Sequence, residues 1–130
     1  MEMRTRLGLL LVAASCMAAA PATAQAAAAL PAGVTPALIA KGKTIFTSTG
    51  LCFACHGADA KGIVGPNLTD TTWLHGKGTY PEIVQIVTTG IPVAETKLGK
   101  GAMPAKGGSQ ISEDDVKAVA AYVWSLSHPT

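Results

Sequence analysis

Two cysteines and a histidine stand close together in an arrangement that can hold a metal-containing cofactor. The segment Cys52-Phe53-Ala54-Cys55-His56 is a Cys-x-x-Cys-His motif. Its spacing lets two thiols reach the two vinyl groups on one edge of a haem, and the adjacent histidine can then bind the iron from one face. This motif is the sequence signature of c-type haem attachment. We therefore expect one covalent haem c per chain, held by Cys52, Cys55 and His56.

Other uses of a Cys-x-x-Cys pair fit the remaining sequence less well. A structural zinc site needs four ligands, and only His75 and His128 remain, neither paired with another ligand. A thioredoxin-like dithiol needs a βαβ setting, and no segment alternates with the period of a strand. A plain structural disulfide is a third alternative. Haem attachment is the preferred interpretation.

The second face of the iron needs its own ligand, and Met103 is the first choice. It lies in Gly101-Ala102-Met103-Pro104, a glycine-rich polar stretch in which a methionine that only fills a core is not expected. His75 is the alternative ligand, and an iron with an open site is the third possibility. A soft thioether favours ferrous iron, so ligation by His56 and Met103 would raise the reduction potential.

The histidine of the motif also needs a partner for its second ring nitrogen. Metal-bound histidine usually donates that N–H to a carbonyl or a carboxylate. The segment Gly65-Pro66-Asn67-Leu68 offers a backbone carbonyl, which Pro66 would stiffen. The alternative is that this segment forms an ordinary turn.

Residues 1–26 have the organisation of an export signal. Two early arginines precede an apolar run at residues 7–12, and small residues with Ala-x-Ala spacing follow at 22–26. An uncleaved membrane anchor and a lipoprotein anchor on Cys16 are the alternatives, but the apolar run is short for a span of ~20 residues. We expect an exported, periplasmic protein with no permanent membrane span.

The charge balance of the remaining chain argues against nucleic acid as a partner. Of ten lysines and arginines and eight acidic residues, both arginines and one glutamate fall in the leader, which leaves 8 − 7 = +1. A nucleic-acid-binding domain would have a dense basic face. The 130 − 26 = 104 residues left make one small domain, which benefits from a covalent staple. We expect a monomer.

Helical signals dominate the rest of the chain and predict an all-α domain with three to five helices. Residues 27–35 suggest a flexible arm and residues 36–130 the domain. Thr35 and Pro36 mark the start of a first helix, which Gly50 is expected to end. Residues 70–74 could form one short helical turn.

Two later helices carry clearer start signals. Thr79 followed by Glu82 fits a capping box, and Gly90 ends that helix. Ser112 is expected to cap the last helix, whose first turn holds three acidic residues. Between them, residues 91–111 form a long glycine- and proline-containing connection that carries Met103, and such a long loop is usually functional or disordered.

Taken together, the order of these features resembles the class I cytochrome c fold over about residues 36–127. Within that class, Gly65 to Asp70 followed by Trp73 and His75-Gly76 is similar to the haem domains of the cytochrome subunit of cbb-type haem-copper oxidases. That subunit has two haem motifs and a membrane span, whereas this chain has one Cys-x-x-Cys-His and no clear span. The difference favours a free carrier over a permanent subunit.

The resemblance implies roles for residues that spacing alone does not assign. It implies that Pro66 supplies the carbonyl to the histidine ligand and that Trp73 lies near a haem propionate. It also implies that the first and last helices cross at Gly42, with Phe46 and Tyr122 packed beside the crossing.

Three functions compete on this evidence. The first is a periplasmic monohaem c-type cytochrome that carries single electrons between redox partners and does no bond chemistry. The second is an electron-accepting haem subunit of a dehydrogenase or terminal oxidase complex, and the third is a haem enzyme or gas-binding protein with an open iron site. Lysines around an exposed haem edge would steer acidic redox partners toward the haem. The alternative is that they are ordinary solvated residues. These lysines are Lys41, Lys43, Lys61, Lys97, Lys100 and Lys106.

Overall fold

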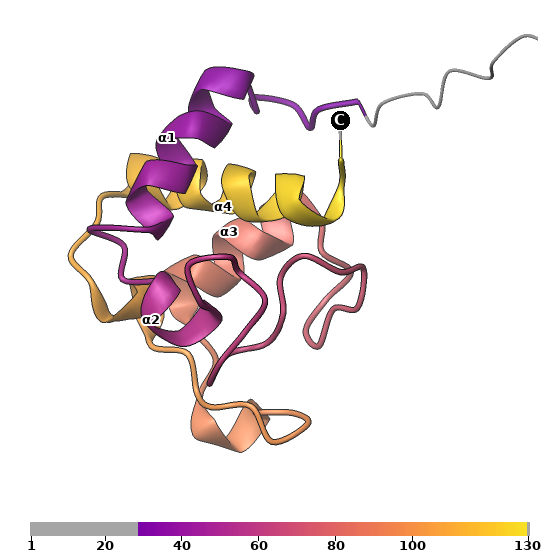
Figure 1. Cartoon of the computed structure of the whole chain (residues 1–130), viewed down its shortest axis with the longest axis vertical. Coiled ribbons are helices and arrows are strands. Elements are labelled where there is room, and N and C mark those ends of the chain that lie inside the picture. The colour runs from indigo at the N-terminus through magenta and orange to yellow at the C-terminus, as the bar shows by residue number, and fades with distance from the viewer. Residues whose placement is uncertain (1–28, 130) are drawn as a thin grey trace, which may run out of the picture.

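Helices are the regular elements of the domain in the computed structural model, which describes residues 29–129 (Figure 1). Within this range there are four α-helices, two short 3-10 helices and no β-strand. They are α1 (Pro36–Phe46), α2 (Phe53–His56), α3 (Tyr80–Thr89), η1 (Val93–Glu95), η2 (Ala105–Gly108) and α4 (Glu113–Ser127). The all-α prediction is confirmed. No helix in the described part of the chain has the length and apolar character needed to cross a membrane. The predicted leader lies outside the described residues.

Helix α1 begins at its predicted residue and ends earlier than expected. The Thr35 hydroxyl accepts a hydrogen bond from the Leu38 N–H at 3.1 Å, and a proline occupies the first turn. The helix stops at Phe46 instead of Gly50. The hydroxyls of Thr47 and Ser48 donate back to carbonyls of the last turn, and such local bonds compete with helix continuation.

Helices α3 and α4 both begin with a reciprocal cap. In α3, the Glu82 carboxylate accepts from the Thr79 N–H at 3.0 Å, as predicted. In α4, the Ser112 hydroxyl accepts from the Asp115 N–H at 3.2 Å, and the Asp115 carboxylate reaches back to the Ser112 N–H at 3.3 Å. Each box satisfies backbone donors that a helix start leaves free. Gly90 ends α3 at a positive φ of 73°, as expected.

The first and last helices cross so closely that one position must be glycine. A Cβ atom added at Gly42 would overlap the carbonyl of Ala118 and lie 2.9 Å from the Cβ of Tyr122. Beside the crossing, the rings of Phe46 and Tyr122 meet edge to face with centroids 5.3 Å apart. Aromatic pairs favour this geometry. The crossing implied by the resemblance is confirmed.

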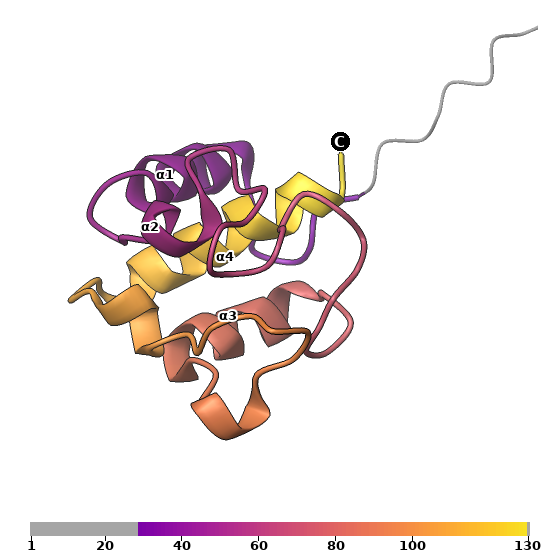
Figure 2. The ribbon, with the colours of Figure 1, turned by 60° about the horizontal axis from the view of Figure 1, so that its bottom comes forward.

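Helix α4 is the centre of the core, with α1 on one side and α3 on the other (Figures 1 and 2). Val116 and Val119 of α4 are almost completely buried, as are Ile83 and Val87 of α3. Ile111, just before α4, is buried in the same cluster. The domain therefore consists of helices packed around α4, and the remaining loops enclose the space beside it.

Two further segments differ from the sequence-based expectation. Residues 70–74 do not form a helical turn, so that prediction was wrong: the Asp70 carboxylate accepts from the Thr72 N–H at 2.8 Å and holds the chain in a turn. The predicted arm is packed against the domain where it is described. Leu30 lies against the core, and Val34 is buried, with its N–H bonded to the Pro31 carbonyl at 3.0 Å.

Candidate functional site

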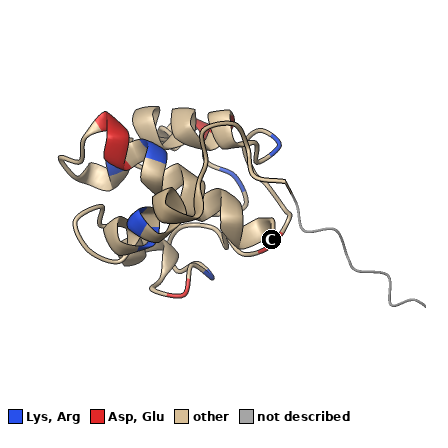
Figure 3. Ribbon diagram, turned by 90° about the horizontal axis from the view of Figure 1, so that it is seen from above, with Lys and Arg blue, Asp and Glu red and all other residues tan. Residues whose placement is uncertain are grey.

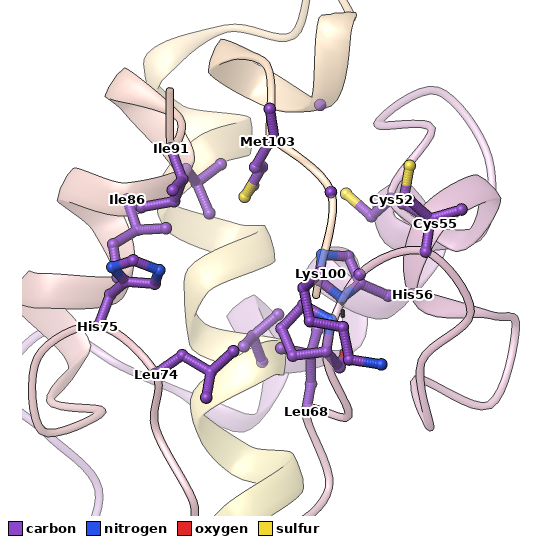
Figure 4. Close-up of a pocket in the computed structure, with 18 of the residues that line it drawn as sticks. Cys52, Cys55, His56, Leu68, Leu74, His75, Ile86, Ile91, Lys100 and Met103 are labelled. Atoms are coloured by element: carbon purple, nitrogen blue, oxygen red, sulfur yellow. Dashed lines mark hydrogen bonds between the residues drawn. The ribbon is translucent and has the colours of Figure 1, made fainter. Parts of the chain in front are cut away.

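One large apolar cavity, called here the main cavity, lies between the Cys-x-x-Cys-His segment, α3, α4 and the loop that carries Met103 (Figure 4). Its empty space, open mouth included, is about 1120 Å³. Helix residues supply much of the apolar wall. They are Phe46, Ile83, Ile86, Val87, Val119 and Val123. A cavity with such an apolar wall suits an apolar group.

Helix α2 brings the two thiols and the histidine of the motif to this cavity. Cys52, Cys55 and His56 stand at positions i, i+3 and i+4, which share one face of a helix. All three line the main cavity, and both cysteines are free thiols. Burial raises the pKa of the Cys52 thiol to about 11, so the thiol is protonated at neutral pH.

His56 is buried and held in one orientation by the Pro66 carbonyl, 3.0 Å from its Nδ1. A carbonyl only accepts, so Nδ1 carries the proton and Nε2 keeps its lone pair. Burial lowers the pKa of His56, and the Pro66 bond partly opposes that shift. The imidazole is therefore in the neutral form that binds iron. Gly65 makes this possible, because a Cβ there would come within 2.7 Å of the His56 ring.

Met103 enters the cavity from the opposite side, and the end of α3 fixes its backbone. Its N–H donates to the Ile91 carbonyl at 2.9 Å, and its carbonyl accepts from the Ile91 N–H at 2.8 Å. Gly90 permits this pairing, because a Cβ there would overlap the Met103 carbonyl. Figure 4 shows the sulfur of Met103 directed into the cavity. The long connection at residues 91–111 is thus structured, with this bridge and the helices η1 and η2.

A tight loop at residues 72–78 closes another part of the wall. Trp73 is half-buried, lines the cavity and packs so closely on Gly78 that a Cβ there would overlap its indole. The Lys97 ammonium donates to the Leu74 carbonyl at 2.8 Å and ties this loop to the Met103 loop. His75 also lines the cavity, on the side of Ile86 (Figure 4).

The donor atoms around the main cavity suit an iron porphyrin better than the alternatives. Two thiols, one imidazole nitrogen and one thioether surround an apolar space, and these are the groups that bind a c-type haem and its iron. Within residues 29–129, no group of three His, Cys, Asp or Glu side chains could hold a metal ion, so a zinc site has no support. The same range has no strand for a thioredoxin-like βαβ unit.

The six lysines considered for steering do not form one free rim. Lys41 pairs with Asp115 at 2.8 Å, and Lys106 pairs with Glu113 at 3.1 Å. Only Lys97 and Lys100 line the main cavity. Figure 3 shows basic and acidic residues distributed around the domain. Lys97 and Lys100 are thus the two of these six lysines that lie at the wall of the main cavity.

Sequence reasoning singled out Gly65 and Gly90 but missed the close contacts that they make in the site, and it missed Gly78 and the tie between the loops. Gly65, Gly78 and Gly90 each lie against a cavity residue, and the bond from Lys97 to Leu74 spans 23 residues. The sequence signal that was available for the tight loop is the pair of glycines at positions 76 and 78. Both glycines have a positive φ in the structure. Long-range contacts of this kind leave no local pattern in the sequence.

Known proteins resemble this chain over most of its length. The profile of the family described as cytochrome C oxidase, cbb3-type, subunit III matches residues 37–123. The cbb3-type cytochrome c oxidase subunit CcoP of Rubrivivax gelatinosus is 43% identical over 93 residues, which cover 71% of this chain and 27% of that protein. Subunit FixP of Azorhizobium caulinodans is 44% identical over 89 residues, covering 68% of this chain and 29% of that protein. The chain thus spans less than a third of the length of these two relatives.

Among solved structures, cytochrome cL from Hyphomicrobium denitrificans superposes on this chain with a TM-score of 0.49 and 24% sequence identity. The superposition covers 66% of this chain and 45% of that one.

Proposed function

Because this chain belongs to the family of cbb3-type cytochrome c oxidase subunit III, we propose that it passes single electrons between redox partners. Its fold is that of a class I cytochrome c, and its cofactor is haem c, as expected from the sequence. When bound, haem c supplies one-electron chemistry, its iron alternating between ferric and ferrous. Cys52 and Cys55 are the proposed covalent anchors, and His56 and Met103 the proposed iron ligands.

The observation that carries this proposal is the arrangement of His56 and Met103 around one apolar cavity. Each is fixed from behind: the ring of His56 by the Pro66 carbonyl, and the backbone of Met103 by its bridge to Ile91. Two ligands held in this way favour a closed iron, and a closed iron suits electron transfer rather than catalysis on a bound substrate.

The other cavity residues have supporting roles in the proposal. The buried side chains of α3 and α4 exclude water from the cofactor. Burial and the Met103 thioether both favour the ferrous state and so raise the potential. Trp73, at the wall beside the tight loop, is the proposed neighbour of a haem propionate.

A second candidate function is that of an electron-accepting subunit within an oxidase complex. It is favoured by the names of the relatives, which are oxidase subunits in Rubrivivax gelatinosus and Azorhizobium caulinodans. In either function, the proposed partners are redox proteins, an oxidase or a dehydrogenase. The predicted leader supports a periplasmic location for both.

A redox titration followed by visible spectra tests the proposal directly. The exported protein is expected to show one reversible one-electron transition, with spectra of a six-coordinate His/Met iron in both states. Rapid carbon monoxide binding to the reduced protein would instead indicate an open iron and contradict the proposed ligation. Stable co-purification with oxidase subunits from the native host would favour the second candidate over a free carrier.

A further inference from the structure

Two lysines line the main cavity, and no carboxylate side chain is among the described residues of its wall. They are Lys97 and Lys100, both in the loop that carries Met103. Most of the other side chains in the wall are apolar, and lysine is ordinarily charged at neutral pH. Positive charge at the edge of an apolar space favours a ligand that brings negative charge of its own.

The ammonium groups of both lysines have donors to spare. Neither lysine forms an ion pair with a carboxylate among residues 29–129, and the lysines that do form ion pairs there do not line the cavity. An ammonium has three N–H donors. Within the same range, the Leu74 carbonyl accepts from Lys97 at 2.8 Å. Two donors of Lys97 and those of Lys100 are therefore left for a ligand.

A tight turn brings the two lysines to neighbouring parts of the wall. The Lys100 N–H donates to the Lys97 carbonyl at 3.1 Å, and the two residues between them both have a positive φ. At one end of the turn, the Lys97 ammonium is bonded to Leu74. At the other end, the Gly101 N–H donates to the Val64 carbonyl at 3.2 Å. The turn is thus tied to the loops on both sides of it, which fixes its place in the wall.

The cofactor of this family carries two carboxylates of its own. In haem c, the two propionates lie on the porphyrin edge opposite the two groups that bind cysteine. Attachment at Cys52 and Cys55 would therefore direct the propionates toward the part of the wall away from α2. Figure 4 shows Leu74, the acceptor of the Lys97 ammonium, on the side of the cavity away from the two cysteines. Trp73, the proposed neighbour of a propionate, directly precedes Leu74.

We propose that Lys97 and Lys100 bind the two haem propionates, with Lys97 acting beside Trp73 and Lys100 at the other end of the turn. The proposal rests on the proposed electron-transfer function and adds a propionate subsite to it. The ammonium N–H groups donate to ionised carboxylate oxygens, and no covalent bond forms or breaks. Charge-assisted hydrogen bonds of this kind are stronger than neutral ones. They favour the ionised form of both propionates in a partly enclosed site.

The rival use of these lysines is to meet the carboxylates of an acidic partner protein. A surface that steers such a partner presents its ammonium groups to solvent. Lys97 is exposed as a residue, but its ammonium donates to a backbone carbonyl at the cavity wall. Lys100 is half-buried. These positions favour carboxylates inside the cavity over carboxylates of a partner.

The test uses the haem-loaded protein with ¹³C in the carboxyl carbons of the propionates. Their NMR signals are followed in the ferrous protein at low salt as the pH is lowered. An opposite charge within ~4–6 Å favours the ionised carboxyl group, so Lys97→Gln and Lys100→Gln should each raise the proton affinity of a propionate by about tenfold. The matched control Lys61→Gln removes the same charge from an exposed lysine that does not line the cavity, and should leave both signals unchanged.

Conservative variants separate the charge of these lysines from their packing. Lys97→Arg and Lys100→Arg keep the positive charge, so the proton affinities of the propionates should stay close to those of wild type. Arg variants that behave like the Gln variants would overturn the proposal, because packing rather than charge would then be responsible.

Propionate signals that are the same in wild type and both Gln variants would also overturn the proposal. If those Gln variants bound an acidic redox partner more weakly, the two lysines would belong to a docking surface instead. A wild-type protein without covalent haem, or with no reversible one-electron transition, would overturn the proposed function itself. The two failures are therefore distinguishable.

Discussion

The crossing of α1 and α4 and the walls of the main cavity are built in different ways. At the crossing, two long helices meet through apolar contacts, with Gly42 against Ala118 and Phe46 against Tyr122. The cavity walls are mostly loops. Single hydrogen bonds between residues distant in the chain hold these loops together, such as the Gly101 N–H to the Val64 carbonyl at 3.2 Å.

This difference separates what stabilises the domain from what defines its site. Helix packing buries apolar surface, which is the dominant favourable term in folding. A single loop hydrogen bond contributes only about 0.5–1.5 kcal/mol net, but it decides where a ligand atom lies. Changes at the crossing should therefore alter stability most, and changes in the walls should alter chemistry most.

The largest expected effect comes from removing both anchoring thiols. Cys52→Ala combined with Cys55→Ala should give protein without covalent haem, because no other thiol lies within residues 29–129. The measurement is haem content after denaturation and acid extraction. Haem that stays with the polypeptide would contradict attachment through this motif.

The next largest effect belongs to the helix crossing. Gly42→Ala should destabilise the domain by at least about 1–3 kcal/mol, because the added methyl group would overpack against Ala118. In an exposed helix, the same change stabilises by ~1 kcal/mol. Denaturant unfolding of the haem-loaded protein measures it. The control is Ala40→Ser on the exposed face of α1, expected to cost about 0.5 kcal/mol or less. Equal unfolding free energies for Gly42→Ala and wild type would show that α1 and α4 can move apart at this crossing without loss of stability.

A cavity-wall substitution should give the reverse pattern. Met103→Leu keeps the volume of the side chain but removes the thioether, so we expect the potential to fall by ~59 mV or more, a tenfold change for one electron. Unfolding free energy should change by less than about 1.5 kcal/mol, as for other volume-conserving swaps. Potentiometry and denaturant unfolding of the same sample measure both effects. An unchanged potential would mean that Met103 is not a ligand.

The smallest effect concerns the cap of α3, which supports the tight loop of the cavity wall. Hydrogen bonds from Thr79 and Lys77 lower the pKa of Glu82 from its ordinary value of 4.5. The stability that this carboxylate provides is therefore present above about pH 4.5 and is lost as the pH falls through the lowered value. Glu82→Gln should lower Tm slightly at pH 7. It should also weaken the dependence of Tm on pH in the acid range.

Its control is Glu95→Gln, which removes a carboxylate with no cap to support. Thermal unfolding between pH 3 and 7 compares the two variants with wild type. If Glu95→Gln flattened the acid dependence as much as Glu82→Gln, general charge rather than the cap would be responsible.

The helices were predictable from the sequence because their signals are local. Thr35, Thr79 and Ser112 each cap the helix that they precede, and each cap involves residues within one turn. The crossing at Gly42 followed from family resemblance, because it depends on α4, far away in the chain. One local signal was misleading. The Asp70 carboxylate accepts a hydrogen bond from the Thr72 N–H, and this bond makes a turn and not a helix.

The cavity walls were predictable only in part. The motif identified Cys52, Cys55 and His56, and the composition of its loop singled out Met103. The tie from Lys97 to Leu74 and the close contact of Gly65 with the His56 ring were not predictable. Each of these depends on segments that meet only after folding, and a lysine or glycine in a loop has no distinctive local environment.

The bridge between Ile91 and Met103 has a consequence for the speed of electron transfer. Electron transfer is faster when fewer atoms must move as the charge changes. The energy cost of that movement is the reorganisation energy. Both backbone polar groups of Met103 are bonded to Ile91, and Pro104, with its restricted φ of −67°, follows directly. The thioether thus extends from a backbone that the end of α3 holds in place, and Gly90 keeps that attachment close. If Met103 is an iron ligand, this backbone pairing would limit its movement between the two oxidation states and so would lower the reorganisation energy.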